Sequence, residues 1–295
     1  MEKIDLVYIL GTGSRWRNNE IRYSLRSVER NFPVGKVFII GECPDWITGA
    51  IHIPAPDIHK NKQANAREKY LIAAKDKRIG ENFALMNDDF FILKSVKKVE
   101  NYSRGTIQEM IDRHPTKSGY YYQSLKDTKR VLESMGIVDP EDFEIHAPIM
   151  FNKEKLLTTI QLVGAEKDYS FRSCYGNLNA LKGKKTIDFK ANGLVEFAYQ
   201  VKRDPTYLSI SDALVAEREF RDWLRRKFRN PSRYETDRGE GADILPGGEM
   251  KSLRYYAVDT FTYAGKTYSQ GEIIQHEIMD ELRNQRQMKD LWVLK

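Results

Sequence analysis

Two adjacent carboxylates, Asp88 and Asp89, follow directly after the apolar run Phe83–Met86. Such a run is typical of a buried strand, and ionised carboxylates beside a core are costly unless a partner neutralises them. A hard divalent cation does so, because Mg²⁺ binds through one or two carboxylates together with substrate phosphates. We therefore predict that Asp88 and Asp89 hold Mg²⁺ or Mn²⁺ against the phosphates of a donor. A solvated turn or a helix cap is the alternative.

His146 is a candidate general base. It follows an acidic stretch that contains Glu141, Asp142 and Glu144, and a neighbouring carboxylate can hold an imidazole ready to accept a proton near neutral pH. The alternative is a structural histidine. Arg172 stands in a short Phe-Arg-Ser segment and has no distinctive context of its own.

Two pairs of polar residues have helical spacing. Arg22 and Arg26 are four positions apart, as are Asn65 and Lys69, so each pair shares one face of its helix. Either pair could reach donor phosphates, and an exposed polar face is the alternative from spacing alone. Asn87, beside the acid pair, is a further donor-side candidate.

The turn Gly11–Ser14 follows the first apolar run, Leu6–Leu10. The third glycine of a dinucleotide-binding fingerprint would fall at Trp16, so that motif is excluded, and no phosphate-binding P-loop occurs elsewhere. The remaining interpretations are an ordinary strand-to-helix turn and a backbone cradle near a nucleotide, to which Gly11, Gly13 and Ser14 would contribute.

Strands and helices alternate over the first ~95 residues, which predicts an α/β domain with a mostly parallel sheet in three layers. The expected strands are 6–10, 37–40, 51–53 and 83–86, and the expected helices follow at about 19–32 and 62–77. Ligands of such sheets bind at the carboxyl ends of the strands. Those ends carry Gly11–Ser14, Gly41-Glu42 and Asn87–Asp89.

The rest of the chain suggests a division into three parts. Helical segments are expected at 106–113, 126–135 and 212–229, and the stretch 254–275 alternates like a β-hairpin before a helix at 276–288. A polar, Gly-rich stretch precedes that hairpin. We predict a catalytic domain at 1–230, a linker or mobile loop at 231–250 and a small C-terminal module of hairpin and helix at 251–295.

The composition narrows the class of protein. The chain has 295 residues with a net charge of +6 and two cysteines, Cys43 and Cys174. Two distant cysteines form neither a disulfide framework nor a zinc motif, and no apolar stretch approaches the ~18 residues of a membrane span. We expect a soluble protein made in the cytoplasm, that of the host if a phage encodes it.

Several segments, in the same order, resemble the conserved regions of the Stealth proteins, which include capsular-polysaccharide hexose-phosphate transferases and a lysosomal GlcNAc-1-phosphotransferase. They cover roughly residues 4–180 and are NNEIRYSLRSVERNFP…KVFIIGECPDWI from Asn18 to Ile47, Ala64-Asn65, FALMNDDFFILKSV at Phe83–Val96, IHAPIMFNKEKL at Ile145–Leu156 and YSFRS at Tyr169–Ser173. The first strand departs from the family, with VYILGTGSRW where a VYTWV-like strand and an Asp are usual. The chain is also similar to compact phage glycosyltransferases, some of which modify hydroxymethylated bases in DNA.

The resemblance implies a GT-A-like nucleotide-sugar domain, a mixed sheet flanked by helices. Asp88 and Asp89 would then handle the metal and the donor phosphates, with Asp89 catalytic, and His146 and Arg172 would lie beside the transferred group. The residues expected to bind the donor are Gly11, Gly13, Ser14, Arg22, Arg26, Asn65, Lys69, Asn87 and Asp88.

The leading hypothesis is a metal-dependent transferase that moves a glycosyl or sugar-1-phosphate group from a nucleotide-sugar, with UDP as the expected nucleotide, to an acceptor hydroxyl. The acceptor is either a glycan or a hydroxymethylated base in duplex DNA. The basic stretch 217–238, with eight positive and five negative charges, would contact DNA, although a solvated, salt-bridged face is the alternative. A hypothesis of another class is a module that binds a nucleotide-sugar without catalysis.

Overall fold

The computed structural model describes residues 3–11, 14, 16, 18–59, 61–164 and 168–236, together with five short strands further along the chain. The chain divides into two compact units, Met1–Asp243 and Ile244–Lys295. In the second unit, β11 (Tyr255–Ala257) pairs antiparallel with both β14 (Ile273–Ile274) and β15 (Trp292–Leu294), and β12 (Phe261–Tyr263) pairs antiparallel with β13 (Lys266–Tyr268). The expected hairpin is therefore present, and the expected helix 276–288 lies outside the described residues.

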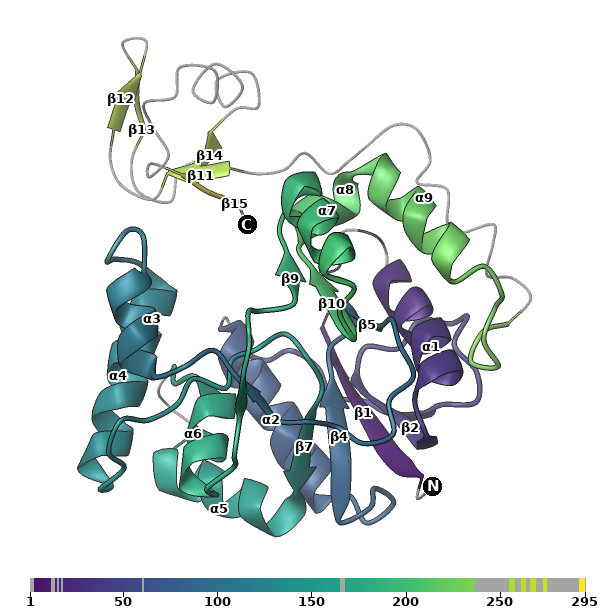
Figure 1. Ribbon diagram of the computed structural model, residues 1–295, viewed down its shortest axis with the longest axis horizontal. Coiled ribbons are helices and arrows are strands. Elements are labelled where there is room, and N and C mark those ends of the chain that lie inside the picture. The colour runs from purple at the N-terminus through teal and green to yellow at the C-terminus, as the bar shows by residue number, and fades with distance from the viewer. Residues whose placement is uncertain are drawn as a thin grey trace. The chain divides into compact units, whose positions relative to one another are not determined.

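A five-stranded sheet forms the centre of the first unit (Figure 1). Its order is β3 (Ile51–Ile53), β2 (Val34–Gly41), β1 (Ile4–Leu10), β4 (Asn82–Met86) and β7 (Ile149–Asn152). The first four strands are parallel, and β7 runs antiparallel to β4. The α/β class with a mixed sheet is thus confirmed, as are the strands expected within β1 to β4.

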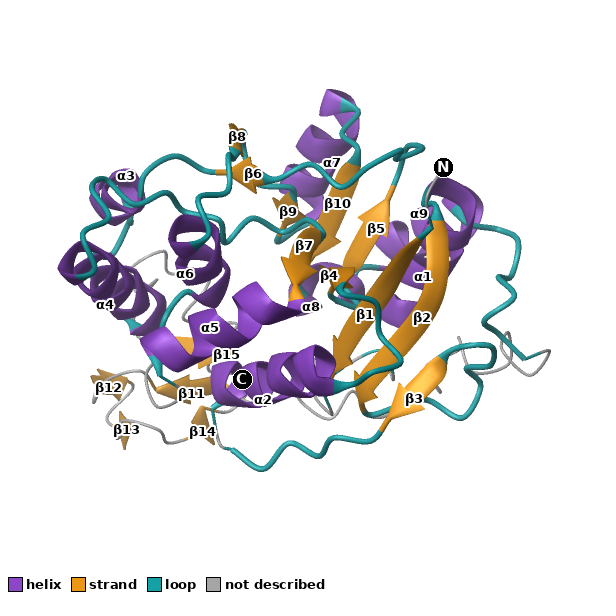
Figure 2. Ribbon diagram, turned by 90° about the horizontal axis from the view of Figure 1, so that it is seen from below, coloured by secondary structure: helices purple, strands orange, loops and turns teal. Residues whose placement is uncertain are grey.

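Helices cover both faces of this sheet (Figure 2). Side chains alternate along a strand, so Leu6 and Tyr8 of β1 pack against α1 (Asn19–Asn31), whereas Val7 packs on the opposite face. That opposite face carries α2 (Lys62–Lys75), α5 (Lys153–Val163) and α6 (Phe171–Leu178). Burying one side chain such as Val7 contributes about 1.5–3 kcal/mol, and the two faces together make a continuous three-layer core.

A second, three-stranded sheet continues from the first. Its order is β5 (Phe90–Ile92), β10 (Tyr207–Ile210) and β9 (Lys190–Ala191), with β10 antiparallel to β5 and parallel to β9. The helices α7 (Leu194–Arg203), α8 (Asp212–Ala216) and α9 (Arg218–Lys227) pack on it through an aromatic cluster. Only three residues separate β4 from β5, so this sheet begins where the acid pair lies.

The remaining elements form a smaller lobe of the first unit. The strands β6 (Tyr102–Ser103) and β8 (Lys184–Lys185) pair in parallel, and α3 (Ile107–Arg113) packs against α4 (Tyr120–Ser134) through Leu125 and Leu132. The helix expected at 126–135 therefore begins earlier, at Tyr120. No helix in the described part of the chain is long and apolar enough to cross a membrane.

Two expectations about the end of the first unit were wrong. The helix expected at 212–229 is divided, because Glu217 adopts an extended conformation between α8 and α9. The expected linker started at residue 231, yet Ser232 and Tyr234 are buried against the first unit and Glu235 forms ion pairs with it. Residues 232–236 therefore belong to the folded unit, and most of the remaining linker lies outside the described residues.

Candidate functional site

The acid pair lies in the turn between β4 and β5. The amide of Phe90 donates to the carbonyl of Asn87 at 3.3 Å, which closes the turn around Asp88 and Asp89. Because β1, β2 and β4 are parallel, Leu10 and Gly41, the last residues of β1 and β2, end at the same edge of the sheet as Asn87. A Cβ on Gly41 would meet the carbonyl oxygen of Leu10 at 1.9 Å and its φ is +121°, so glycine is required at this edge.

The helix α1 holds β5 in place by hydrogen bonds that a neighbouring strand would otherwise make. Ser24 Oγ donates to the carbonyl of Phe90 at 2.6 Å, and Asn31 Nδ2 donates to the carbonyl of Ile92 at 2.6 Å. The amide of Ile92 donates to Ser27 Oγ at 2.9 Å. The polar side of α1 therefore fixes the strand that begins directly after Asp89, and it links two of the Stealth-like segments physically.

Two further carboxylates, Glu20 and Asp212, lie near the acid pair in this turn. We call Glu20, Asp88, Asp89 and Asp212 the acid cluster. Burial raises the pKa of Asp88 well above its usual range, and the charges of Asp89, Glu20 and Asp212 raise it further. Burial, together with the charges of Asp212 and Asp89, also raises the pKa of Glu20 to about 7, against a hydrogen bond from Ser14. Carboxylates that repel one another in a buried site favour protonation or a bound cation.

Asp89 differs from Asp88 because it faces cationic and polar groups. Burial raises the pKa of Asp89, but the charges of Lys190 and His146 and a hydrogen bond from Ser209 act against that rise. Ser209 Oγ donates to Asp89 Oδ2 at 3.1 Å, and Lys190 is the register partner of Ser209 in the second sheet. Asp89 therefore connects the acid cluster with the basic side of the site.

His146 lies on this basic side. Its Nδ1 donates to Asp188 Oδ2 at 2.8 Å, and Lys190 Nζ lies 3.4 Å from its Nε2. The imidazole meets the ring of Phe90 edge-on, with 6.1 Å between centroids, and its side chain is 29% exposed. His146 and Asp89 thus both lie near Lys190, although 57 positions separate them in sequence.

Arg172 braces the chain around His146. Its Nη1 donates to the carbonyls of Ile145 and Ala147, both at 2.8 Å. Its guanidinium lies 5.5 Å from the centre of the Phe90 ring. The side chain is buried, so the contacts seen here hold the histidine loop, and its expected contact with the transferred group stays a prediction.

A small cavity of about 10 Å³ lies beside this loop and is lined by Arg172, Ile145 and Pro148, among other residues. That volume is about one water molecule. His146 does not line this cavity, and the pocket for an extruded base that the DNA hypothesis requires beside His146 stays a prediction.

The structure gives Arg22 and Arg26 a partner that the helical spacing did not reveal. Both guanidinium groups bind Glu235, at 2.8 and 2.7 Å. Arg22 also lies over the ring of Trp46 at 3.8 Å, and Arg26 donates to the carbonyl of Phe228 at 3.0 Å. Both side chains are buried, which excludes the exposed basic face, and their expected phosphate contact stays a prediction. The two arginines fasten residues 232–236 to α1.

The polar pair on α2 closes a loop at the end of β1. Lys69 Nζ donates to the carbonyl of Leu10 at 2.9 Å and forms an ion pair with Asp57. Asn65 exchanges two hydrogen bonds with the backbone of His59, each 2.8 Å long. Gly11 belongs to the same corner, because a Cβ there would lie 3.0 Å from Asp57 Oδ2. These residues border the strand-end edge, but their polar groups are engaged within the protein.

The glycine-serine turn after β1 supports the acid cluster. Ser14 Oγ donates to Glu20 Oε2 at 2.7 Å and accepts the amide of Asn18 at 2.7 Å. Gly13 lies outside the described residues. Ser14 therefore ties this turn to the first helical turn of α1, and the donor roles predicted for Ser14 and Gly13 stay predictions.

Several residues at the site were missed in the sequence. Asp212 follows the buried strand β10 after one residue, Ser211, which caps α8. The reasoning that singled out Asp88 therefore applies to Asp212 as well. Lys190 is the first residue of the two-residue strand β9, and Asp188 lies two positions before it, so neither belongs to a segment with a periodic pattern. Glu20 lies in the first turn of α1, and its position in a helix does not by itself distinguish it from a solvated acid.

The basic stretch near α9 is partly neutralised. Asp222 pairs with Arg225 at 2.8 Å and with Arg218 at 3.6 Å, and Arg221 donates to two carbonyls at the end of α8. Arg233 pairs with Glu29. These contacts agree with a salt-bridged face, and contact with DNA stays a prediction.

In the part of the chain that the structure describes, no three His, Cys, Asp or Glu side chains are arranged to hold a metal ion by themselves. Two carboxylates with substrate phosphates as the other ligands are sufficient for Mg²⁺. The half-buried pair Asp88 and Asp89 fits such a cation, because the positive charge of the cation would offset the repulsion between the carboxylates.

No protein-family model and no curated protein sequence matches the chain. Among solved structures it is similar to the apo form of the glycosyltransferase GlyE of Streptococcus pneumoniae TIGR4, with a TM-score of 0.40 and 12% identity over 77% of this chain and 60% of that one. It is also similar to the galactosyltransferase LgtC in complex with donor and acceptor sugar analogs, with a TM-score of 0.45 and 10% identity over 81% of this chain and 100% of that one. A third is a glycosyltransferase involved in glycosylation of the major capsid of PBCV-1, with a TM-score of 0.37 and 12% identity over 76% of this chain and 99% of that one.

The chain thus spans about 60% of the length of GlyE and the whole of LgtC. At TM-scores of 0.37 to 0.45, these likenesses are similarities to glycosyltransferases and are too weak to assign a function.

Proposed function

We propose that this chain is a metal-dependent transferase that uses a nucleotide-sugar, with a UDP-sugar as the first candidate, and moves a glycosyl or sugar-1-phosphate group to an acceptor hydroxyl. The observation that carries the proposal is the acid cluster at the strand-end edge, in which Glu20 is buried and Asp88 and Asp89 are half-buried. Asp89 in turn faces His146 and Lys190. A negatively charged side that favours a cation and a side that can accept a proton are what transfer to a hydroxyl requires.

Asp88 and Asp89 would hold the divalent cation. Glu20 and Asp212 increase the negative potential around Asp88, which favours a cation over a neutral ligand at that position. When bound, the cation offsets the negative charge that builds on the departing phosphates.

His146 would accept the proton of the acceptor hydroxyl. Nδ1 is engaged by Asp188, so Nε2 is the nitrogen directed to the site. Lys190, 3.4 Å from that nitrogen, would bind an anionic oxygen of the donor, because an ammonium group is a good phosphate ligand. Arg172 would keep the loop of His146 rigid through Ile145 and Ala147.

The order of the Stealth-like segments supports the same assignment. The segment around α1 carries Glu20 and the serine contacts to β5, and the segment Phe83–Val96 carries Asp88 and Asp89. The last two carry His146 and Arg172. Four of the five segments, all but Ala64-Asn65, would therefore contribute to the proposed site.

The test is turnover of a panel of nucleotide-sugars by the full chain with Mn²⁺ or Mg²⁺, followed by mass spectrometry of candidate acceptors. We expect release of a nucleoside diphosphate or monophosphate that stops in excess EDTA and resumes with Mn²⁺. Asp112→Asn, on the exposed side of α3, is the matched control and should retain full turnover. Turnover that continues unchanged in EDTA would contradict the metal assignment. Binding of a nucleotide-sugar without turnover on any acceptor would favour the non-catalytic module.

Which nucleotide leaves distinguishes the two reactions, because glycosyl transfer releases UDP and sugar-phosphate transfer releases UMP. The acceptor panel needs a glycan arm and a hydroxymethylated duplex DNA arm. Binding to DNA should weaken steeply with salt if DNA is the acceptor, since phosphate contacts release counterions.

A further inference from the structure

Asp188 accepts hydrogen bonds from both the backbone and the side chain of His146. Its Oδ1 accepts the backbone amide of His146 at 2.9 Å and that of Phe189 at 2.8 Å. Its Oδ2 accepts Nδ1 of the same histidine at 2.8 Å and lies 3.5 Å from Nη1 of Arg104. One carboxylate therefore fixes both the backbone and the ring of His146.

These contacts keep Asp188 ionised. Burial alone would raise the pKa of its carboxyl, but the hydrogen bonds and charge of His146 and the charge of Arg104 outweigh burial and hold the pKa at about 2. An ionised carboxylate has no hydrogen to donate. The hydrogen between Asp188 and His146 must therefore reside on Nδ1, and the neutral ring carries its lone pair on Nε2.

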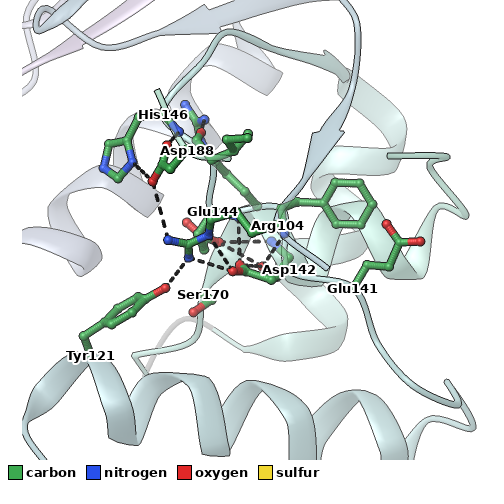
Figure 3. A network of polar contacts seen from close by, with 12 residues as sticks. Arg104, Tyr121, Glu141, Asp142, Glu144, His146, Ser170 and Asp188 are labelled. Carbon is green, nitrogen blue, oxygen red and sulfur yellow. Dashed lines mark hydrogen bonds and ion pairs between the residues drawn. The ribbon is translucent and has the colours of Figure 1, made fainter. Parts of the chain in front are cut away.

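Arg104 anchors Asp188 from behind (Figure 3). Its Nε donates to Asp142 Oδ2 at 2.7 Å, and its Nη2 contacts both that oxygen, at 2.6 Å, and the hydroxyl of Tyr121. The Asp142 side chain is fully buried. We call the chain of contacts Asp142–Arg104–Asp188–His146 the histidine relay. Its two carboxylates, one guanidinium and one imidazole leave little net charge when the ring is protonated.

We propose that Asp188, held by Arg104, is the positioning residue that fixes His146 as the Nδ1–H tautomer, with Nε2 presented to the acceptor hydroxyl. This inference rests on the proposed function. In the step, the acceptor O–H proton passes to Nε2 and the acceptor oxygen bonds to the transferred carbon or phosphorus. The bond from that atom to the departing nucleotide breaks with its electron pair. Asp188 balances the imidazolium that results, as an orienting carboxylate does in other histidine-based sites.

The critical variant is Asp188→Asn. The amides of His146 and Phe189 both donate to the Oδ1 position, so they should retain the amide oxygen there and turn the NH₂ group toward Nδ1. A donor facing Nδ1 forces the hydrogen onto Nε2, which can then no longer accept a proton. We expect kcat to fall about 10²-fold or more, with a much smaller change in KM for the donor.

The direct readout is the ¹⁵N imidazole spectrum of the full chain at a pH where the ring is neutral. The signals of His146, one of five histidines, are assigned by comparison with His146→Gln. We expect the Nδ1–H tautomer in the wild type, the Nε2–H tautomer in Asp188→Asn, and recovery of Nδ1–H with part of kcat in Asp188→Glu. Asp204→Asn is the control, because Asp204 is 81% exposed and pairs only with Lys94 among its described contacts.

A wild-type spectrum that shows Nε2–H would overturn the proposal even if Asp188→Asn does not fold. So would a folded Asp188→Asn variant that keeps either the Nδ1–H tautomer or the wild-type kcat. The spectrum does not depend on any substrate. If the expected tautomers are seen but the wild type turns over no donor, the positioning of His146 by Asp188 is supported while the proposed function is contradicted.

Discussion

The acid cluster and the histidine relay meet where Asp89 faces His146, and they differ in how their charges are balanced. Carboxylates in the acid cluster repel one another, and burial raises the pKa of Asp88 and of Glu20, the latter to about 7. In the relay, Arg104 separates two carboxylates and the pKa of Asp188 is held at about 2. The first cluster therefore favours protonation or a bound cation, whereas the carboxylates of the second are paired with Arg104 and His146 within the protein.

This difference indicates that the acid cluster and the histidine relay have different roles. A site that stays electrostatically unsatisfied can bind a charged ligand strongly, whereas a satisfied network fixes geometry. The acid cluster should therefore lose function but not stability when an acid is removed, and the relay should lose both.

The largest expected effect is on turnover. Asp89→Ala should reduce donor turnover about 10³-fold, because it removes a metal ligand and the group that faces Lys190 and His146. The variant should remain folded, since a buried repulsion is relieved. The turnover assay checks the loss of activity, and circular dichroism with thermal unfolding checks that the variant is folded. A variant that unfolds, or one that retains wild-type turnover, would contradict the role assigned to the acid cluster.

The next largest effect is on stability. Arg104→Met leaves Asp142 buried without its cation, and should lower the free energy of unfolding by about 3 kcal/mol. Adding Asp142→Asn should recover much of that loss, because the uncompensated charge is then gone. Urea unfolding of the single and double variants measures it. As a control, Arg130→Met removes an exposed ion pair with Asp127 and should change stability little. Equal losses of stability in Arg104→Met and Arg130→Met would refute the idea that the relay contributes more than a surface ion pair.

Glu20 should make stability depend on pH. A pKa raised from 4.5 to about 7 means that the folded state binds more protons between those values, so stability should fall as pH rises through that window. At about 1.4 kcal/mol per pKa unit, a rise of about 2.5 units corresponds to a loss of about 3.5 kcal/mol over the whole window. Glu20→Gln should flatten the dependence, and excess Mn²⁺ should reduce it in the wild type. Urea unfolding at about pH 5 and pH 8 tests this. The exposed Glu154→Gln should keep the wild-type slope.

The smallest effect is expected outside both clusters. Charge reversal at Arg225 and Arg226 on α9 should change donor turnover less than about twofold, since surface substitutions seldom disturb a distant site. Binding to duplex DNA, measured at two salt concentrations, should weaken only if this helix is an acceptor surface. Unchanged DNA affinity together with clear transfer to a glycan would remove the DNA hypothesis.

The sequence by itself determined the alternation of strands and helices in the first unit and the place of Asp88 and Asp89 at the end of β4. Both follow from local rules, because burial of a strand requires an apolar run and a carboxylate directly after it must lie at the sheet edge. The same rule, applied after β10, would have found Asp212.

Only the tertiary structure decided what the other charged residues do. Helical spacing correctly placed Arg22 and Arg26 on one face of α1, but their partner, Glu235, lies more than 200 positions away. Likewise, Asp188 reaches His146 across 42 positions from the loop before β9, and a loop has no periodic pattern that would predict this contact. The function of a charge depends on which groups surround it, and long-range packing brings those groups together without leaving a periodic pattern in the sequence.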